Sequence, residues 1–134
     1  MKSLAVLFLS LLLVEPLLAQ GPSPDARPAQ SLYYTLTPAL VGNYGSAERL
    51  KYYKADVALR LSDAQAEERI RHHEPLIRDR LVMLFAQQTE QTLGSVEAKE
   101  QLRQQALEQV RQVLEQEEGR PLVDDLLFNN LIVQ

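Results

Sequence analysis

The chain has 134 residues, of which 46% are apolar and 24% charged, an ordinary globular composition that favours a single domain. Its 14 Lys and Arg residues stand against 18 Asp and Glu residues, which gives a net charge of −4. That sign argues against a nucleic-acid binder and against a polybasic membrane-surface binder, because both need a basic face. The absence of cysteine excludes disulfides, thiol nucleophiles, thiolate metal sites and a lipidated N-terminal cysteine.

Residues 1–19 are typical of a secretory signal peptide. A positive start and an apolar run of 11 residues precede Pro16, which stops the helix shortly before a small residue, Ala19. We expect cleavage between Ala19 and Gln20. The alternative is a short retained membrane anchor, although spanning a bilayer takes about 20 apolar residues.

Residues 20–31 contain three prolines together with glycine and serine, a composition that is typical of an extended linker. We therefore expect the folded domain to occupy residues 32–134. Its first segment, 32–37, is rich in aromatic and β-branched residues and predicts a strand. Pro38 ends or bends this strand, and residues 40–44 continue it.

Segment 50–61 is the clearest predicted strand. Its side chains alternate between two faces, which is the period of a sheet with one solvent-exposed face. It should form an antiparallel hairpin with the preceding strand around residues 42–49. The expected inner face consists of Tyr53, Ala55, Val57, Leu59 and Leu61, and the expected outer face of Tyr52, Lys54, Asp56 and Arg60.

Helical spacing dominates the middle of the chain. Ser62 or Asp63 is expected to cap a first helix, and Pro75 should break or kink it so that a second helix starts at that proline. Ser95 should cap the next helix, which Gly119 ends. The predicted buried stripes are Ile70, Ile77, Leu81, Leu84 and Phe85, followed by Leu102, Ala106, Val110, Val113 and Leu114.

Segment 122–133 predicts a third strand with apolar side chains on both faces. This favours a central strand, or one whose second face meets a partner. The predicted fold is therefore α+β, with a small antiparallel sheet of about three strands packed against two to three helices. The two expected faces of this strand are Leu126, Phe128 and Ile132, and Leu127, Leu131 and Val133.

The sequence His72-His73-Glu74 is the only cluster that suggests a metal or catalytic site. Adjacent helical residues point about 100° apart, so the two histidines cannot hold one ion from a regular helix. The histidine spacing of zinc-protease helices, four residues with a glutamate between, is also absent. We interpret the cluster as a solvated polar turn ahead of Pro75.

The remaining carboxylates have equally plain interpretations. Asp124 and Asp125 should face opposite sides of a strand, and Glu115, Glu117 and Glu118 should form a solvated helix end. Neither a glycine-rich phosphate loop nor a serine elbow occurs in the sequence. We predict a non-enzyme without cofactor or metal. The alternative, a metal-dependent hydrolase, would need ligands that converge near the two histidines.

Several segments resemble the FliL family of flagellar proteins. Residues 73–85, HEPLIRDRLVMLF, are similar to a family helix that carries a proline, an apolar-x-Arg pair and a leucine-rich run. Thr92-Leu93 followed by residues 97–99 resembles the next stretch of the family, and residues 123–134 resemble its terminal strand. The strand at 53–61 also fits, so the resemblance covers about residues 32–134.

The resemblance implies a stomatin-like domain at the periplasmic face of the inner membrane. It also implies a ring-forming, non-enzymatic scaffold that associates with the flagellar basal body and the stator proteins MotA and MotB. Such a scaffold would support flagellar rotation, motility and chemotaxis. Family members keep a longer N-terminal membrane helix, so the short cleavable run here implies a soluble variant. The alternative is a soluble periplasmic binding or chaperone-like domain unrelated to motility.

Overall fold

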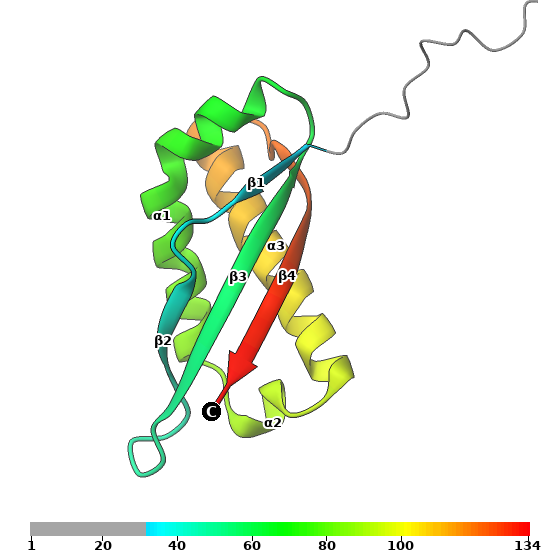
Figure 1. Cartoon of the computed structure of the whole chain (residues 1–134). Helices are drawn as coiled ribbons and strands as arrows, with labels where there is room; N and C mark the ends of the chain where they lie inside the picture. Colours follow the sequence, from blue (N-terminus) through cyan, green and yellow to red (C-terminus); the bar gives the residue numbers. More distant parts are fainter. Residues whose placement is uncertain (1–31) are drawn as a thin grey trace, which may run out of the picture. The chain divides into compact units, whose positions relative to one another are not determined.

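A computed structural model describes residues 32–134 (Figure 1). The predicted signal peptide, its cleavage site between Ala19 and Gln20, and the predicted linker lie outside the described residues. The fold is α+β, as predicted. Its elements in chain order are β1 (Tyr33–Thr35), β2 (Leu40–Tyr44), β3 (Lys51–Leu61), α1 (Ala66–Ala86), α2 (Glu90–Leu93), α3 (Val96–Glu118) and β4 (Val123–Val133).

One antiparallel sheet contains all four strands. β3 is the central strand: β4 runs along one side of it, while β1 and β2 share the other side one after the other. The predicted first strand is thus split at Pro38, which explains why the sheet has four strands instead of about three. Of the two alternatives for the last strand, the central position is wrong, because β4 pairs with β3 alone in the described sheet; a second face that meets a partner stays a prediction.

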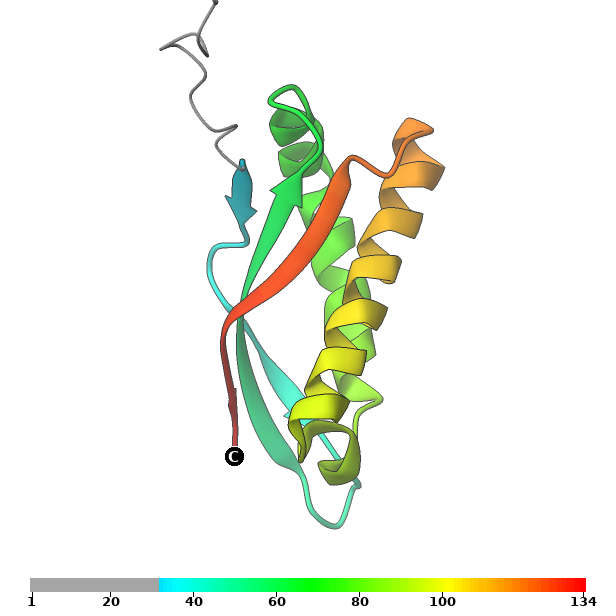
Figure 2. The same ribbon diagram turned by 90° about the vertical axis from the view of Figure 1, so that its right-hand side faces the viewer.

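Both long helices pack on the same face of the sheet (Figures 1 and 2). The inner face of β3 is buried as the alternation predicted, and the ring of Tyr53 stacks on that of Phe85 at 4.2 Å between centroids. The predicted helix stripes are buried too, with Leu84 only partly so. None of the helices in residues 32–134 has the length and apolar character that a membrane span requires.

Helix α1 continues through Pro75, so the predicted break and the predicted start of a second helix there were wrong, while the alternative of a kink stays a prediction. A proline inside a helix costs about 3 kcal/mol, because it removes one hydrogen bond and crowds the preceding turn. Ile70, Ile77, Leu81 and Phe85 lie on both sides of it and are fully buried on one stripe. Burying each contributes about 1.5–3 kcal/mol, and an unbroken helix keeps all four in register.

The predicted caps of α3 are confirmed, and Ser95 Oγ accepts a hydrogen bond from Ala98 N at 3.0 Å. The N-cap of α1 is Gln65, whose side chain makes no capping bond, although Asp63 Oδ1 accepts a hydrogen bond from Ala66 N at 2.9 Å in the preceding turn. Gly119 ends α3 with φ at 75°, a left-handed conformation that favours glycine. Ser62 does not cap α1, since its hydroxyl donates to Asp124 Oδ1 instead.

Strand β4 contains two irregularities in its pairing with β3, and the one at Asn129 changes which side chains face the core. Phe128 pairs with Val57 whereas Asn130 pairs with Asp56, so Asn129 is an extra residue, a β-bulge. An extra residue switches the alternation of side chains along the strand. Leu131 and Val133 therefore pack against the core with Leu126 and Phe128, and Ile132 faces outward. The predicted grouping of β4 side chains was wrong beyond the bulge for this reason.

Candidate protein-interaction surfaces

His72 and His73 lie in the middle of α1, not in a polar turn before Pro75. His73 Nε2 lies 2.7 Å from Glu118 Oε1 at the end of α3, and His72 packs edge-on against His73. The hydrogen bond with His73 holds the pKa of Glu118 below its usual value against the opposing effect of burial, and Arg69 adds to the shift. The pair joins the two long helices, which is a structural role.

Glu74 takes part in a second set of contacts, which joins α1 to β1 and to Pro38 at the split edge of the sheet. It accepts hydrogen bonds from the Tyr34 hydroxyl and from Arg78, whose Nη2 also donates to Pro38 O at 2.6 Å. Burial, together with the contact to Glu74, raises the pKa of Tyr34. Within residues 32–134 no group of three His, Cys, Asp or Glu side chains is placed to bind a metal ion.

The other predicted carboxylates also have separate partners. Asp124 accepts from Ser62, whereas Asp125 accepts from Arg103 Nη1 and from the backbone N–H of Leu126. The two carboxylates thus have different partners, although the pairing of β4 with β3 is irregular at Asp124. Glu115 and Glu117 are exposed at the end of α3, as predicted.

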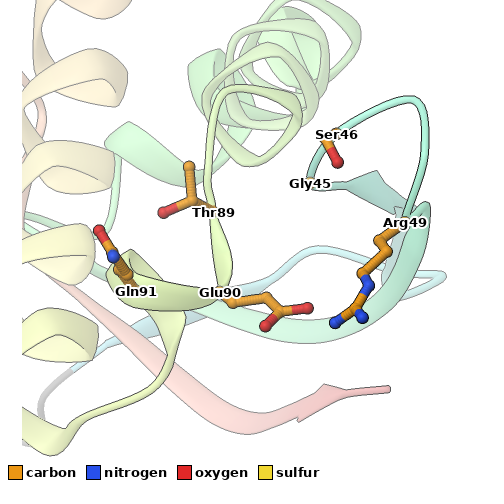
Figure 3. A pocket seen from close by; sticks show the side chains of 6 residues that line it. All are labelled: Gly45, Ser46, Arg49, Thr89, Glu90 and Gln91. Atoms are coloured by element: carbon orange, nitrogen blue, oxygen red, sulfur yellow. The ribbon is translucent and has the colours of Figure 1, made fainter.

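A cavity of about 400 Å³ lies between the β2–β3 loop and α2 (Figure 3). Arg49 and Glu90 extend toward each other across its opening, while Thr89 and Gln91 supply further polar lining. Glu90 is already bound by Lys51 Nζ at 2.8 Å, and this hydrogen bond lowers the pKa of Glu90. The cavity therefore has a mixed lining, in which Arg49, Thr89, Glu90 and Gln91 supply the polar groups.

The face of the sheet opposite the helices carries an exposed apolar patch. Val41 on β2, Tyr52 on β3 and Ile132 on β4 are 66%, 58% and 41% exposed. The strand register places Val41 and Ile132 on either side of Lys54, and a cavity of about 230 Å³ lies among these side chains. We call Val41, Tyr52 and Ile132 the open-face patch. Grouped exposed apolar side chains of this kind mark contact sites.

A groove follows the edge of β4. At the start of the strand, Arg111 and Arg103 from α3 donate to Val123 O and Leu126 O, at 3.0 and 2.9 Å. Hydrogen bonding to Arg103 lowers the pKa of Glu100 to about 2. Farther along, a cavity of about 370 Å³ opens between β4 and the start of α3. We call this the edge groove; its lining residues are Val96, Lys99, Glu100, Arg103, Leu127, Phe128 and Leu131.

Helix α1 also exposes apolar side chains: Leu76 and Met83 lie seven residues apart on one side of the helix, whereas Val82 points about 100° away from Met83. The sequence indicated part of these surfaces, because one of the two interpretations of the last strand is a second apolar face that meets a partner. It did not single out Val41, Val96 or the exposed side chains of α1. The available signal was an apolar residue at a position where the local period expects a polar one.

The profile of a family described as "Flagellar basal body-associated protein FliL" matches residues 33–134, which include every element of the described fold. The chain belongs to the FliL family. A curated relative, "Flagellar protein FliL" of Aquifex aeolicus (strain VF5), is 25% identical over 109 residues. The match covers 81% of this chain, which spans 65% of that relative's length.

The FliL match confirms the resemblance inferred from residues 73–85 and from the terminal strand. FliL is a family of flagellar basal body-associated proteins and not an enzyme family. The His73–Glu118 and Tyr34–Glu74 contacts fit this assignment, because each joins two elements of the fold. The surfaces that remain for function are the apolar ones.

Proposed function

We propose that this FliL-family protein is a non-enzymatic scaffold at the flagellar basal body, and that it supports flagellar rotation, motility and chemotaxis. In this proposal it works at the periplasmic face of the inner membrane, forms oligomers and contacts the stator proteins MotA and MotB. Family membership supports the basal-body association. The predicted signal peptide supports export, and the family resemblance supports a stomatin-like arrangement of the domain.

The observation that carries the scaffold proposal is the number of separate apolar surfaces. An oligomeric scaffold needs at least one surface for copies of itself and another for its partner. The open-face patch and the edge groove both border β4, while Leu76 and Met83 are exposed on α1. A contact along β4 therefore leaves the exposed side chains of α1 available for a second contact.

A clean deletion of the gene tests the role in motility. We expect reduced swimming and swarming, and recovery when the wild-type chain is restored. The variant Tyr52→Ser should recover less than wild type, because it removes the largest exposed side chain of the open-face patch. His72→Ala, an exposed residue of α1, is the matched control and should recover fully. Unchanged swimming and swarming in the deletion strain would refute the proposal.

Export is tested separately by sequencing the N-terminus of the protein recovered from the periplasmic fraction. A mature chain that begins at Gln20 supports the cleaved signal. A chain that begins at Met1 and sediments with the inner membrane would instead support the retained anchor, and it would leave the basal-body role untouched.

A further inference from the structure

The last part of β4 has a backbone edge without a partner strand in the described chain. Tyr52 and Gln134 exchange two backbone hydrogen bonds, with N···O distances of 3.0 and 2.8 Å. In an antiparallel pair such bonded positions alternate, so Ile132 and Asn130 also direct their N–H and C=O groups toward β3. Leu131 and Val133 therefore direct theirs away from the sheet.

This open stretch lacks the features that usually protect an edge. At the start of β4, Arg103 and Arg111 occupy edge carbonyls, and the bulge at Asn129 interrupts the strand. Residues 130–134 contain no charge, proline or further bulge. Natural proteins use such features to prevent strand pairing between molecules, so an edge without them is a pairing site.

The open stretch is also chemically symmetric about its own middle. Its sequence is an amide, three aliphatic residues and an amide: Asn130, Leu131, Ile132, Val133 and Gln134. An interface between two copies around a two-fold axis requires such self-complementarity, because the same surface serves both partners. An axis through Ile132 places amide opposite amide and aliphatic opposite aliphatic.

We propose that β4 pairs antiparallel with β4 of a second copy of this chain, around a two-fold axis at Ile132. This inference rests on the oligomeric scaffold proposed above and specifies one contact within it. Because a two-fold contact joins only two copies, a larger ring needs a second, different contact between copies. Leu131 exchanges backbone hydrogen bonds with Val133 of the second copy, and Ile132 faces Ile132 of the second copy. The two four-stranded sheets become one continuous sheet.

Apolar surface on both faces of the strand supports this pairing. On the outer face, Ile132 lies in the wall of the cavity of the open-face patch. On the helix side, Phe128 and Leu131 line the edge groove together with Val96, which is 80% exposed. Figure 2 shows β4 turning away from α3 toward its C-terminal end, where the open stretch lies. Val133 of the second copy would lie beside Leu131, next to this groove.

Charge does not oppose the contact. Each copy carries a net charge of −4, yet none of residues 130–134 is charged, so the pairing brings no like charges face to face. A strand of unrelated sequence would satisfy the backbone groups but would not match the amide–aliphatic–amide order. A second copy matches that order at every position.

Cysteine cross-linking of the full chain tests the register. Ile132 and its symmetry mate form a pair without mutual hydrogen bonds, with Cα atoms about 4.5 Å apart, a distance that a disulfide can span. Because the wild-type chain has no cysteine, the variant Ile132→Cys carries a single thiol. Met83→Cys, at an exposed position on α1, is the matched control. Under mild oxidation Ile132→Cys should form covalent dimer about tenfold faster or more, since pairing raises the local thiol concentration.

Sedimentation of the full chain over a concentration series tests the dimer itself. Ile132→Lys sets two like charges opposite each other and should raise the dissociation constant about tenfold or more. An equimolar mixture with Ile132→Glu should restore the dimer, while far-UV circular dichroism checks that both variants fold.

Three results would overturn the inference: equal cross-linking rates for the two cysteine variants, a wild-type chain that stays monomeric to about 1 mM, or self-association that Ile132→Lys does not change. Reduced motility of the deletion strain together with a monomeric chain would keep the proposed function and reject only this pairing. A dimer together with normal motility would do the reverse.

Discussion

Replacing Tyr53 with phenylalanine should raise the free energy of unfolding, although it removes a polar group from the centre of the sheet. Only 2% of the Tyr53 side chain is exposed, and its hydroxyl has no hydrogen-bond partner among the described residues. A buried hydroxyl without a partner costs about 1–3 kcal/mol. The ring itself stays in place, because its stacking on Phe85 does not involve the hydroxyl.

The expected gain is smaller than that cost, because removing the oxygen leaves a small void. A void of roughly 15 Å³ costs about 0.4 kcal/mol. The net stabilisation by Tyr53→Phe should therefore be about 0.5–2.5 kcal/mol. For a domain of this size, 1 kcal/mol corresponds to a rise in Tm of about 4–8 °C.

Urea unfolding followed by far-UV circular dichroism measures the effect at pH 7, with Tyr52→Phe as the matched control. Tyr52 is exposed, so that change should alter stability by less than about 0.5 kcal/mol. If Tyr53→Phe instead lowers the free energy of unfolding by 1 kcal/mol or more, the hydroxyl is hydrogen-bonded in solution and the reasoning fails.

The same pair of proteins gives a second readout at high pH. Burial raises the pKa of Tyr53 above that of the unfolded chain. A group whose pKa is raised on folding keeps its stabilising effect below the unfolded pKa and loses it as pH rises. The stability of wild type should therefore fall faster than that of Tyr53→Phe above about pH 10. Parallel curves would show that Tyr53 ionises equally in both states.

Other substitutions test separate parts of the fold. Gly42→Ala would place its Cβ 2.8 Å from the Tyr53 hydroxyl oxygen, so we expect the free energy of unfolding measured in urea to fall by about 1–3 kcal/mol. An unchanged urea midpoint would refute the close approach of Gly42 to Tyr53. Pro75→Ala should raise the free energy of unfolding by about 1–2 kcal/mol, because the regained helix bond exceeds the lost rigidity of the unfolded chain; a destabilised variant would contradict the unbroken α1. Glu118→Gln should be less stable than wild type at pH 7. Because the pKa of Glu118 is lowered on folding, its contribution is present above the unfolded pKa and is lost as pH falls through the folded pKa. The difference in stability between the two proteins should therefore shrink in acid; a constant difference would exclude an ionic role for Glu118.

Local periodicity predicted the parts of the fold that depend on local sequence. The alternation from Tyr53 to Leu61 identified the inner face of β3, and the spacing of Leu102, Ala106 and Val110 identified the buried stripe of α3. These elements are long and strongly periodic, so the polarity of each side chain indicates whether it faces the core or the solvent. The caps at Ser95 and Gly119 were predictable because each depends on one residue type at one position.

The errors arose where distant contacts decide the outcome. Pro75 carries a local cost that the burial of Ile77 and Phe85 outweighs, and a sequence window does not contain the surfaces on which they pack. The bulge at Asn129 leaves no mark in composition, since one extra residue in a strand looks like any other. Which side of β3 receives the last strand also depends on contacts far apart in sequence.

The candidate surfaces divide in the same way. The apolar second face of the last strand could be predicted from the sequence, and it suggested a partner there. The free backbone edge could not be predicted, because an edge is defined only once the strand order is known. Only the fold shows that Val41 and Val96 belong to these surfaces. Val41 lines the same cavity as Ile132, and Val96 lines the same groove as Phe128.

Because the first edge is split at Pro38, β1 and β2 can separate from β3 independently. β1 has three residues, and none of them is fully buried. β2 begins with Leu40 and ends with Tyr44, and both of these side chains are buried. β1 can therefore detach from β3, with loss of the Tyr34–Glu74 hydrogen bond, at a lower free energy than unfolding of the whole domain, while β2, β3 and β4 keep the core closed. A protease that attacks extended chain would cut near residues 33–35 long before the domain unfolds, and the remaining three-stranded core would survive the cut.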